Sequence, residues 1–214
     1  MQSINRCDLG VKRECKQGQQ SMRFNEYRFL VRSDLYRYTG KVRGALFLKH
    51  ILRNPGFQYS FWIRTCAFLE QSRIWRHGIL FIARIILHRY TYKYGISIPY
   101  STKIGSGFVI GHFGGIVVSN RAVIGKNCTI AHGVTVGKAN RGKNKGYPTI
   151  RDNVYIGPGA KIVGKVRVGD NVAIGANCVV TKDVPDNAVV VGVPGEVISY
   201  NGSQDYVNRT DYSV

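Results

Sequence analysis

The sequence predicts a mainly β protein, in which a parallel β-helix of hexapeptide repeats follows a basic α-helical region. From Ile104 onward, branched aliphatic residues recur every six positions, a period that fits neither an α-helix nor a single strand. Gly, Asn or Asp occupies one fixed position in most repeats, where tight turns need a positive φ. Before residue 95, apolar residues instead recur at helical spacing. We therefore expect four segments: a disordered leader over 1–21, α-helices over 22–95, the β-helix over 96–200 and a C-terminal tail over 201–214.

Composition limits the class of protein. Apolar residues make up 44% of the 214 residues, which is enough for a packed core. The five cysteines are scattered and form no CxxC pair. This spacing argues against a disulfide scaffold and a zinc ribbon, and it favours a reducing, cytoplasmic compartment. The most apolar run, 78–87, is short and contains Arg84, whereas a membrane span needs about 20 apolar residues.

The basic charge is concentrated in the predicted helices, because residues 22–103 carry +12 of the formal net charge of +19. Such a segment suits an acidic or lipid-linked glycan or an anionic membrane, or it is only a solvated surface. Its last apolar stripe, from Ile74 through Ile82 to Ile85, could lie on a membrane surface or pack against a neighbouring element. No nucleic-acid-binding motif accompanies the charge, so we expect no nucleic acid partner.

Short strands and tight corners repeat along the C-terminal half. Small residues that suit an inward corner stand four positions after most of the periodic aliphatics. A short strand, a corner and another short strand every six residues form a solenoid, with three hexapeptides in each triangular coil. The longest unbroken run of periodic aliphatics is Ile150, Ile156, Ile162, Val168, Ile174 and Val180.

This pattern resembles the hexapeptide-repeat acyltransferases. Residues 97–200 are most similar to the serine acetyltransferase-like enzymes, especially to O-acetyltransferases of capsular and exopolysaccharide synthesis. The resemblance implies a left-handed parallel β-helix and a homotrimer whose active sites lie between neighbouring subunits. It also implies an acetyl-CoA-dependent acyltransferase, with acetyl-CoA as co-substrate.

The first interruption of the repeat lies between Ile110 and Val118, which are eight residues apart instead of six. The segment Gly-His-Phe-Gly-Gly-Ile-Val-Val resembles the family motif His-x-x-Gly-Ile-Val-Val, whose histidine is the catalytic base. The resemblance assigns this role to His112. A neutral imidazole can take the proton of an alcohol as its oxygen attacks a thioester, which is typically worth about 10²- to 10⁴-fold in rate. A corner histidine that only packs is the alternative.

A second histidine, His132, follows Ile130 by two residues, as His112 follows Ile110. The two histidines are 20 residues apart, which is one coil of 18 residues plus the two-residue insertion. We therefore expect both imidazoles on one face, one coil apart. There His132 either lines the substrate cleft or only packs. No third histidine lies in the predicted β-helix, so we expect no metal site.

The second interruption is the loop 138–149. Related enzymes use this excursion to close over the active site of the neighbouring subunit. Lys143 and Lys145 in the loop would suit an anionic acceptor or the phosphates of coenzyme A, unless the loop is simply a solvated basic one.

Segment 174–185 resembles the coenzyme A segment of the family. The match implies that Pro158 and Ala176 contact the pantetheine arm through backbone groups. It also implies that Thr181 and Lys182 lie near the adenosine and its phosphates. The alternative for Lys182 is an ordinary surface lysine.

Several positions depart from the serine acetyltransferase pattern. Gly111 and Ser97 stand where those enzymes carry carboxylates, and Gly146 and Tyr147 stand where they carry an Arg-His pair. A zwitterionic amino acid needs charged partners at both ends. Tyr147 instead offers a ring and a hydroxyl that suit a sugar face. We therefore expect Gly111 and Tyr147 to border a sugar acceptor.

Together these features favour transfer of acetyl from acetyl-CoA to a sugar hydroxyl of a surface polysaccharide or its lipid-linked precursor. Such an enzyme would work in the cytoplasm, with peripheral contact to the membrane. A serine O-acetyltransferase of cysteine biosynthesis is the first alternative. A non-catalytic β-helix that acts as a scaffold is the second.

Overall fold

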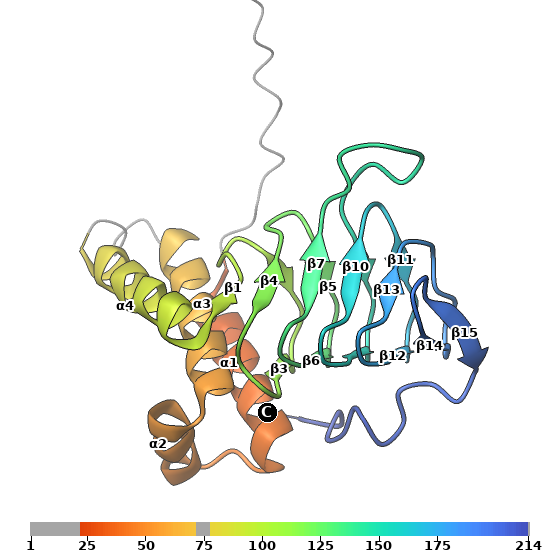
Figure 1. Cartoon of the computed structure of the whole chain (residues 1–214). Helices are drawn as coiled ribbons and strands as arrows, with labels where there is room; N and C mark the ends of the chain where they lie inside the picture. The colour runs from red at the N-terminus through yellow and green to blue at the C-terminus, as the bar shows by residue number, and fades with distance from the viewer. Residues whose placement is uncertain (1–21, 72–77, 214) are drawn as a thin grey trace, which may run out of the picture.

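The computed structural model describes residues 22–71 and 78–213, and it places four helices at one end of a three-sided β-helix (Figure 1). The expected leader, 1–21, and the start of the apolar stripe at Ile74 lie outside the described residues. No helix of the described ranges is long and apolar enough to cross a membrane. The helices are α1 (Phe24–Thr39), α2 (Gly44–Arg53), α3 (Pro55–Gln71) and α4 (Ile79–Tyr94).

Local sequence signals set the helix ends. Asn54 caps α3, since its side-chain Oδ1 accepts a hydrogen bond from the backbone N–H of Phe57 at 2.9 Å, and Pro55 takes the first helical position. Gly40 ends α1 and Gly95 ends α4, both in the left-handed conformation that closes a helix C-terminus. The end of α4 therefore leads directly into the first strand of the β-helix.

The strands form three sheets, parallel except for β15, and from β1 to β13 successive strands pass from one sheet to the next. Sheet 1 contains β1 (Ile96–Ser97), β4 (Ile116–Val118), β7 (Thr135–Gly137), β10 (Lys161–Val163) and β13 (Val179–Val180). Sheet 2 contains β2 (Lys103–Ile104), β5 (Val123–Ile124), β8 (Thr149–Ile150) and β11 (Arg167–Val168). Sheet 3 contains β3 (Val109–Ile110), β6 (Thr129–Ile130), β9 (Tyr155–Ile156), β12 (Ala173–Ile174), β14 (Val189–Val191) and the antiparallel β15 (Glu196–Ser199).

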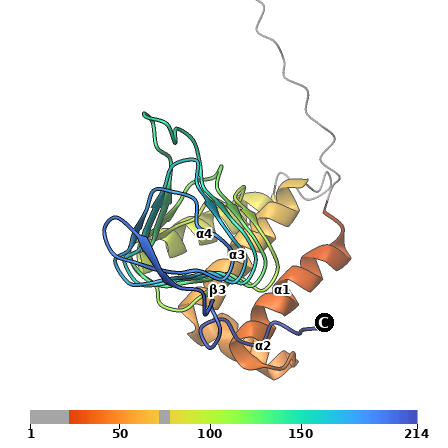
Figure 2. The ribbon, with the colours of Figure 1, turned by 90° about the vertical axis from the view of Figure 1, so that its right-hand side faces the viewer.

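The coils lie one behind another when the molecule is turned by 90° (Figure 2). The register explains this, because each strand pairs with the strand of the next coil and aliphatic faces aliphatic, as in Ile130 with Ile156. The hexapeptide repeat and the N-terminal helices predicted from the sequence are therefore confirmed. Their arrangement is consistent with a left-handed β-helix.

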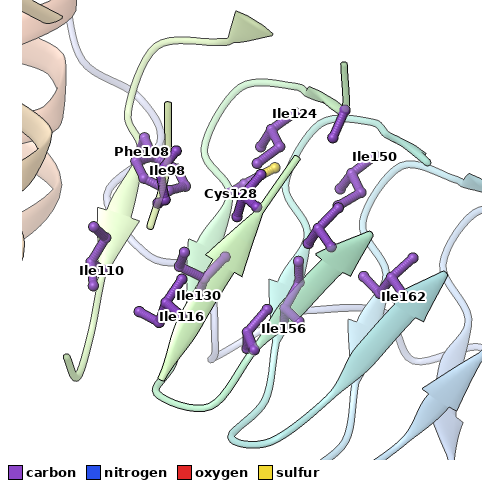
Figure 3. Packing of buried hydrophobic residues seen from close by; sticks show 14 of the residues in the cluster. Ile98, Phe108, Ile110, Ile116, Ile124, Cys128, Ile130, Ile150, Ile156 and Ile162 are labelled. Carbon is purple, nitrogen blue, oxygen red and sulfur yellow. The ribbon is translucent and has the colours of Figure 1, made fainter. Parts of the chain in front are cut away.

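The periodic aliphatics form the core. All six residues of the longest predicted run are at most 2% exposed. Figure 3 shows Ile124, Ile130, Ile150 and Ile156 directed into the space that the strands enclose. Burial of a branched aliphatic side chain contributes about 1.5–3 kcal/mol. Because the repeat places one such side chain in each strand, each strand adds a contribution of this size.

The corners between sheets 2 and 3 are held by a ladder of asparagines. Asn127, Asn153, Asn171 and Asn187 all have φ between 57° and 61°, a left-handed conformation that asparagine tolerates. The side-chain amide of each of the first three donates to the Oδ1 of the next asparagine, at 2.9, 2.9 and 3.1 Å. The same residues therefore turn the chain and link the coils.

The C-terminal tail is not a free extension in this structure. After β15 the chain runs back along the β-helix and ends beside α1 (Figure 1). Arg37 Nε donates to the carbonyl of Asn208 at 2.6 Å, Arg209 Nη1 donates to the carbonyl of Tyr38 at 2.6 Å, and Tyr212 Oη donates to Ser106 Oγ at 2.8 Å. The tail thus joins the helices to the first coil.

The thiols of Cys66 and Cys128 should resist alkylation in the folded protein. Burial raises the pKa of Cys66 to about 11 and that of Cys128 to about 12, so both are protonated near pH 8. Because the thiolate is the nucleophile, iodoacetamide should modify both at least about tenfold more slowly than in urea-unfolded protein. Peptide mass spectrometry measures the rates, and equal rates in the two states would contradict the burial.

Candidate active site

His112 lies in a turn that leaves β3 and enters β4. Gly111 N still donates to the carbonyl of Ile130 at 2.9 Å, so the chain stays in register up to the histidine. The turn then closes through Gly114 and Gly115, whose φ values are +111° and +64°. A Cβ on Gly115 would lie 3.4 Å from the Cα of Gly133 in the next coil. The two-residue insertion is thus accommodated by glycines, and it leaves His112 exposed.

The imidazoles of His112 and His132 are neighbours. Their ring centroids are 6.1 Å apart and the ring planes are nearly perpendicular, at 78°. Ile110 pairs with Ile130, so the two histidines occupy equivalent positions in successive coils. Both side chains are exposed. Two solvent-accessible imidazoles on one edge are suited to proton transfer with an external hydroxyl.

Pro158 and Ala176 continue the same line along the β-helix. Ile130 pairs with Ile156, and Ile156 pairs in the same way with Ile174. The residue two positions after each of these aliphatics therefore lies at the same corner of its coil. We call this corner, between sheets 3 and 1, the histidine edge; it contains Gly111, His112, His132, Pro158 and Ala176.

The other candidate residues lie across sheet 1, at the corner where it passes into sheet 2. The loop leaves β7 as a hairpin, in which Ala139 and Gly146 form an antiparallel bridge. Asn144 Nδ2 donates to the carbonyl of Thr181 at 2.7 Å, which fastens the loop to the segment after β13. We call this corner the loop edge; it contains Lys143, Lys145, Tyr147, Thr181 and Lys182.

Two cations lie against the ring of Tyr147. The Arg121 guanidinium is 5.6 Å and the Lys138 ammonium 5.7 Å from the ring centroid. A cation within about 6 Å of an aromatic ring is attracted to its face. Tyr147 therefore packs with basic side chains of its own chain, while Lys143 and Lys145 remain exposed.

Sequence reasoning missed two residues that border the histidine edge. Lys161, at an outward position of β10, donates from Nζ to the carbonyl of Gly133, the residue after His132. Phe113, beside His112, is 51% exposed, and its ring lies 5.4 Å from that of Tyr94 at the end of α4. A lysine on an otherwise apolar strand face is a signal that the sequence could have given. The contact between Phe113 and Tyr94 depends on where α4 ends.

Tyr38 of α1 supplies the neighbour that β3 lacks. β3 is the first strand of sheet 3, so one side of it has no strand partner. The Tyr38 hydroxyl accepts from Ile110 N at 2.9 Å and donates to Ile110 O at 3.1 Å. Burial raises the pKa of Tyr38, so the hydroxyl keeps its proton. Gly56 lets α3 approach as well, since a Cβ there would lie 2.2 Å from the Ile110 carbonyl oxygen.

Tyr38→Phe should destabilise the protein by about 1–3 kcal/mol, because it leaves both backbone groups of Ile110 buried without a partner. Urea unfolding measures the change. Tyr36→Phe on the same helix is the matched control, with an expected change within about 0.5 kcal/mol. Equal effects of the two substitutions would contradict a special role for the Tyr38 hydroxyl.

Comparison with known proteins gives consistent results. A family model described as bacterial transferase hexapeptide (six repeats) matches residues 147–182. The serine acetyltransferase of Synechococcus elongatus is 37% identical over 166 residues, which cover 78% of this chain and 65% of that protein. The serine acetyltransferase of Mycobacterium tuberculosis is 42% identical over 125 residues, or 58% of this chain and 55% of that protein. The chain thus spans less than two thirds of the length of these curated relatives.

Solved structures match a larger share of this chain and of their own chains. Serine acetyltransferase from Brucella abortus strain S19 in complex with coenzyme A has a TM-score of 0.67 and 32% identity, covering 84% of this chain and 70% of that one. Serine acetyltransferase from Neisseria gonorrhoeae in complex with serine has a TM-score of 0.65 and 30% identity, covering 85% and 72%.

These relatives correct the expected acceptor. The preference for a sugar hydroxyl of a surface polysaccharide is wrong, since the matched relatives are serine acetyltransferases. The preference rested on missing charged partners at Ser97, Gly111, Gly146 and Tyr147. Exposed cations of the loop edge, Lys143, Lys145 and Lys182, stand at positions other than these four.

Proposed function

The chain belongs to the hexapeptide-repeat transferases, alongside serine acetyltransferases, and from this premise we propose that it transfers acetyl from acetyl-CoA to the hydroxyl of L-serine. The observation that carries the proposal is the exposed His112 in the interrupted coil, next to His132 and in line with Pro158 and Ala176. The histidine edge thus offers His112 as a proton acceptor. Beside it, the small side chain of Ala176 and the cyclic one of Pro158 leave the backbone accessible.

In the proposed reaction His112 acts as the general base. As the serine oxygen attacks the thioester carbonyl carbon, the imidazole takes the hydroxyl proton. The C–S bond then breaks, and the imidazolium donates that proton to the leaving thiolate of coenzyme A. Such general-base help is typically worth about 10²- to 10⁴-fold. Backbone N–H groups of the glycine-rich turn are the donors that we assign to the developing oxyanion.

The loop edge supplies the charged contacts in this proposal. Lys143 and Lys145 are assigned to the serine carboxylate or the coenzyme phosphates, because both are exposed cations on an ordered hairpin. Thr181 and Lys182 are assigned to the adenosine end. Asn144 connects the two groups through its hydrogen bond to Thr181. Tyr147 borders the acceptor in this arrangement and carries no charge of its own.

We further propose that the active unit is a homotrimer. In one chain the histidine edge and the loop edge lie on opposite borders of sheet 1, so a single chain does not bring the two groups together. A neighbouring copy that places its loop edge against the histidine edge completes the site.

Light scattering should give a mass three times the chain mass of 23.9 kDa, and an active monomer would contradict this assembly.

The test of function is coenzyme A release measured as free thiol, with L-serine as acceptor and L-alanine, which lacks the hydroxyl, as its matched control. We expect release with serine and none above background with alanine. Mass spectrometry should identify O-acetylserine as the product. Thiol release that requires a different hydroxyl compound would overturn the assignment of serine as the acceptor, but not the proposed acetyl transfer. No release and no binding of coenzyme A would leave the scaffold alternative.

A further inference from the structure

The outer face of α4 carries large apolar side chains that the described part of the chain does not cover. Phe81 is 65% exposed, Ile82 57% and Ile85 52%. The opposite face is buried against the main core through Leu80 and Leu87. We call Phe81, Ile82 and Ile85 the apolar tip. Contiguous exposed apolar side chains of this size mark a binding surface more often than isolated ones do.

The same outer face becomes basic and aromatic toward the end of the helix. Arg89 and Lys93 are exposed, and Tyr92 between them is 75% exposed. Helical spacing places Phe81, Ile85, Arg89 and Tyr92 along one stripe. Arg84 is engaged elsewhere, since it pairs with Glu70 at 3.1 Å. The outer face thus changes from apolar to cationic over about three turns.

The apolar tip lies on the half of α4 that is farther from the β-helix (Figure 1). It is therefore accessible to a flat surface that approaches the helical end of the molecule. The cationic half of α4 would then lie nearer the protein body, where long basic side chains can reach lipid headgroups.

Charge decides between the possible occupants of this face. Residues 22–103 carry a net charge of +12, so a second copy docked through the same face would bring two strongly positive regions together. An anionic bilayer has the opposite charge, and its acyl chains accept the apolar tip. Each basic residue near such a surface contributes favourably, and the aromatic Tyr92 suits the interface.

We propose that α4 docks this protein on an anionic phospholipid bilayer, with the apolar tip among the acyl chains and Arg89 and Lys93 at the headgroups. The helix lies at the interface and does not span the membrane. This proposal does not depend on which acceptor is acetylated.

Vesicle sedimentation of the full chain tests it, with phosphatidylcholine vesicles that either contain or lack phosphatidylglycerol. We expect binding only to the anionic vesicles. Phe81→Ser/Ile85→Ser should weaken it at least about tenfold. Arg89→Gln/Lys93→Gln should also weaken it and reduce its dependence on salt. The matched control is Val197→Ser/Ile198→Ser, which removes exposed apolar side chains from β15 at the opposite end of the β-helix and should change nothing.

Two results would overturn the proposal. One is absence of binding to anionic vesicles, or binding that the α4 variants do not weaken. The other is a larger particle mass for the wild type than for Phe81→Ser/Ile85→Ser, measured by light scattering without lipid. That result would identify a second copy as the occupant. Circular dichroism melts of all variants should match the wild type, because the substituted side chains are exposed.

Discussion

His112→Ala should lower kcat for acetyl transfer to L-serine by about 10²- to 10⁴-fold. The substitution removes the group that takes the hydroxyl proton in the proposed reaction. The side chain is exposed and its turn is closed by Gly114 and Gly115, so the fold should not change. The KM for acetyl-CoA should stay close to the wild-type value, because the coenzyme contacts are assigned to other residues. Thiol-release kinetics measure both constants.

His132→Ala is the matched control for this prediction. It removes an imidazole that is also exposed, from the equivalent position of the next coil, with the two ring centroids 6.1 Å apart. We expect a smaller loss of kcat than for His112→Ala, since His132 borders the site without accepting the proton. A larger loss for His132→Ala would reverse the two roles. Unchanged kcat in both variants would exclude base catalysis from the histidine edge.

The sequence predicted the β-helix well because its signal is local and repeated. Each periodic aliphatic meets its equivalent in the next coil, as Ile130 meets Ile156, so a period read from the sequence becomes a register in space. Asn127 and Asn153 were recognisable as turn residues for a similar reason, since their conformation depends mainly on the residue type.

Contacts between distant segments could not be read in this way. Nothing in the sequence shows that Tyr38 replaces a strand beside Ile110, or that Tyr212 reaches Ser106. The candidate site has the same limitation. The spacing correctly placed His112 beside His132, but it did not show that Thr181 and Lys182 lie on another edge of the same chain. Motif matching also led to the wrong acceptor, because it weighed only four matched positions, whereas the curated relatives that the chain resembles are serine acetyltransferases.

Asp34→Ala should lower the free energy of unfolding by about 3–5 kcal/mol, the largest stability loss that we expect from a single polar substitution in this protein. The Asp34 and Arg64 side chains are 1% and 6% exposed. The carboxylate accepts from Arg64 Nε at 3.1 Å and from Nη2 at 3.3 Å. Removal of the carboxylate leaves a buried guanidinium without its counter-charge, and urea unfolding measures the cost.

The pair matters because it fastens two helices to the first coil. Asp34 belongs to α1 and also accepts from Phe108 N at 2.8 Å. Arg64 belongs to α3 and also donates to the carbonyls of Ile104 and Gly105, at 2.6 and 2.5 Å. Ile104 and Gly105 lie at the end of β2, and Phe108 directly precedes β3, which leads to His112. Asp34→Ala should therefore loosen the start of the β-helix as well as the contact between the helices.

A double variant separates the charge from the geometry. Asp34→Leu/Arg64→Met removes both charges and keeps similar volume, an exchange that is often neutral for a buried pair. Here recovery should be only partial, because Phe108 N loses its acceptor in both variants and the Ile104 and Gly105 carbonyls also lose their donor in the double variant. We thus expect the double variant to be more stable than Asp34→Ala and less stable than the wild type. A double variant no more stable than the single one would mean that the backbone hydrogen bonds, and not the paired charges, hold this junction.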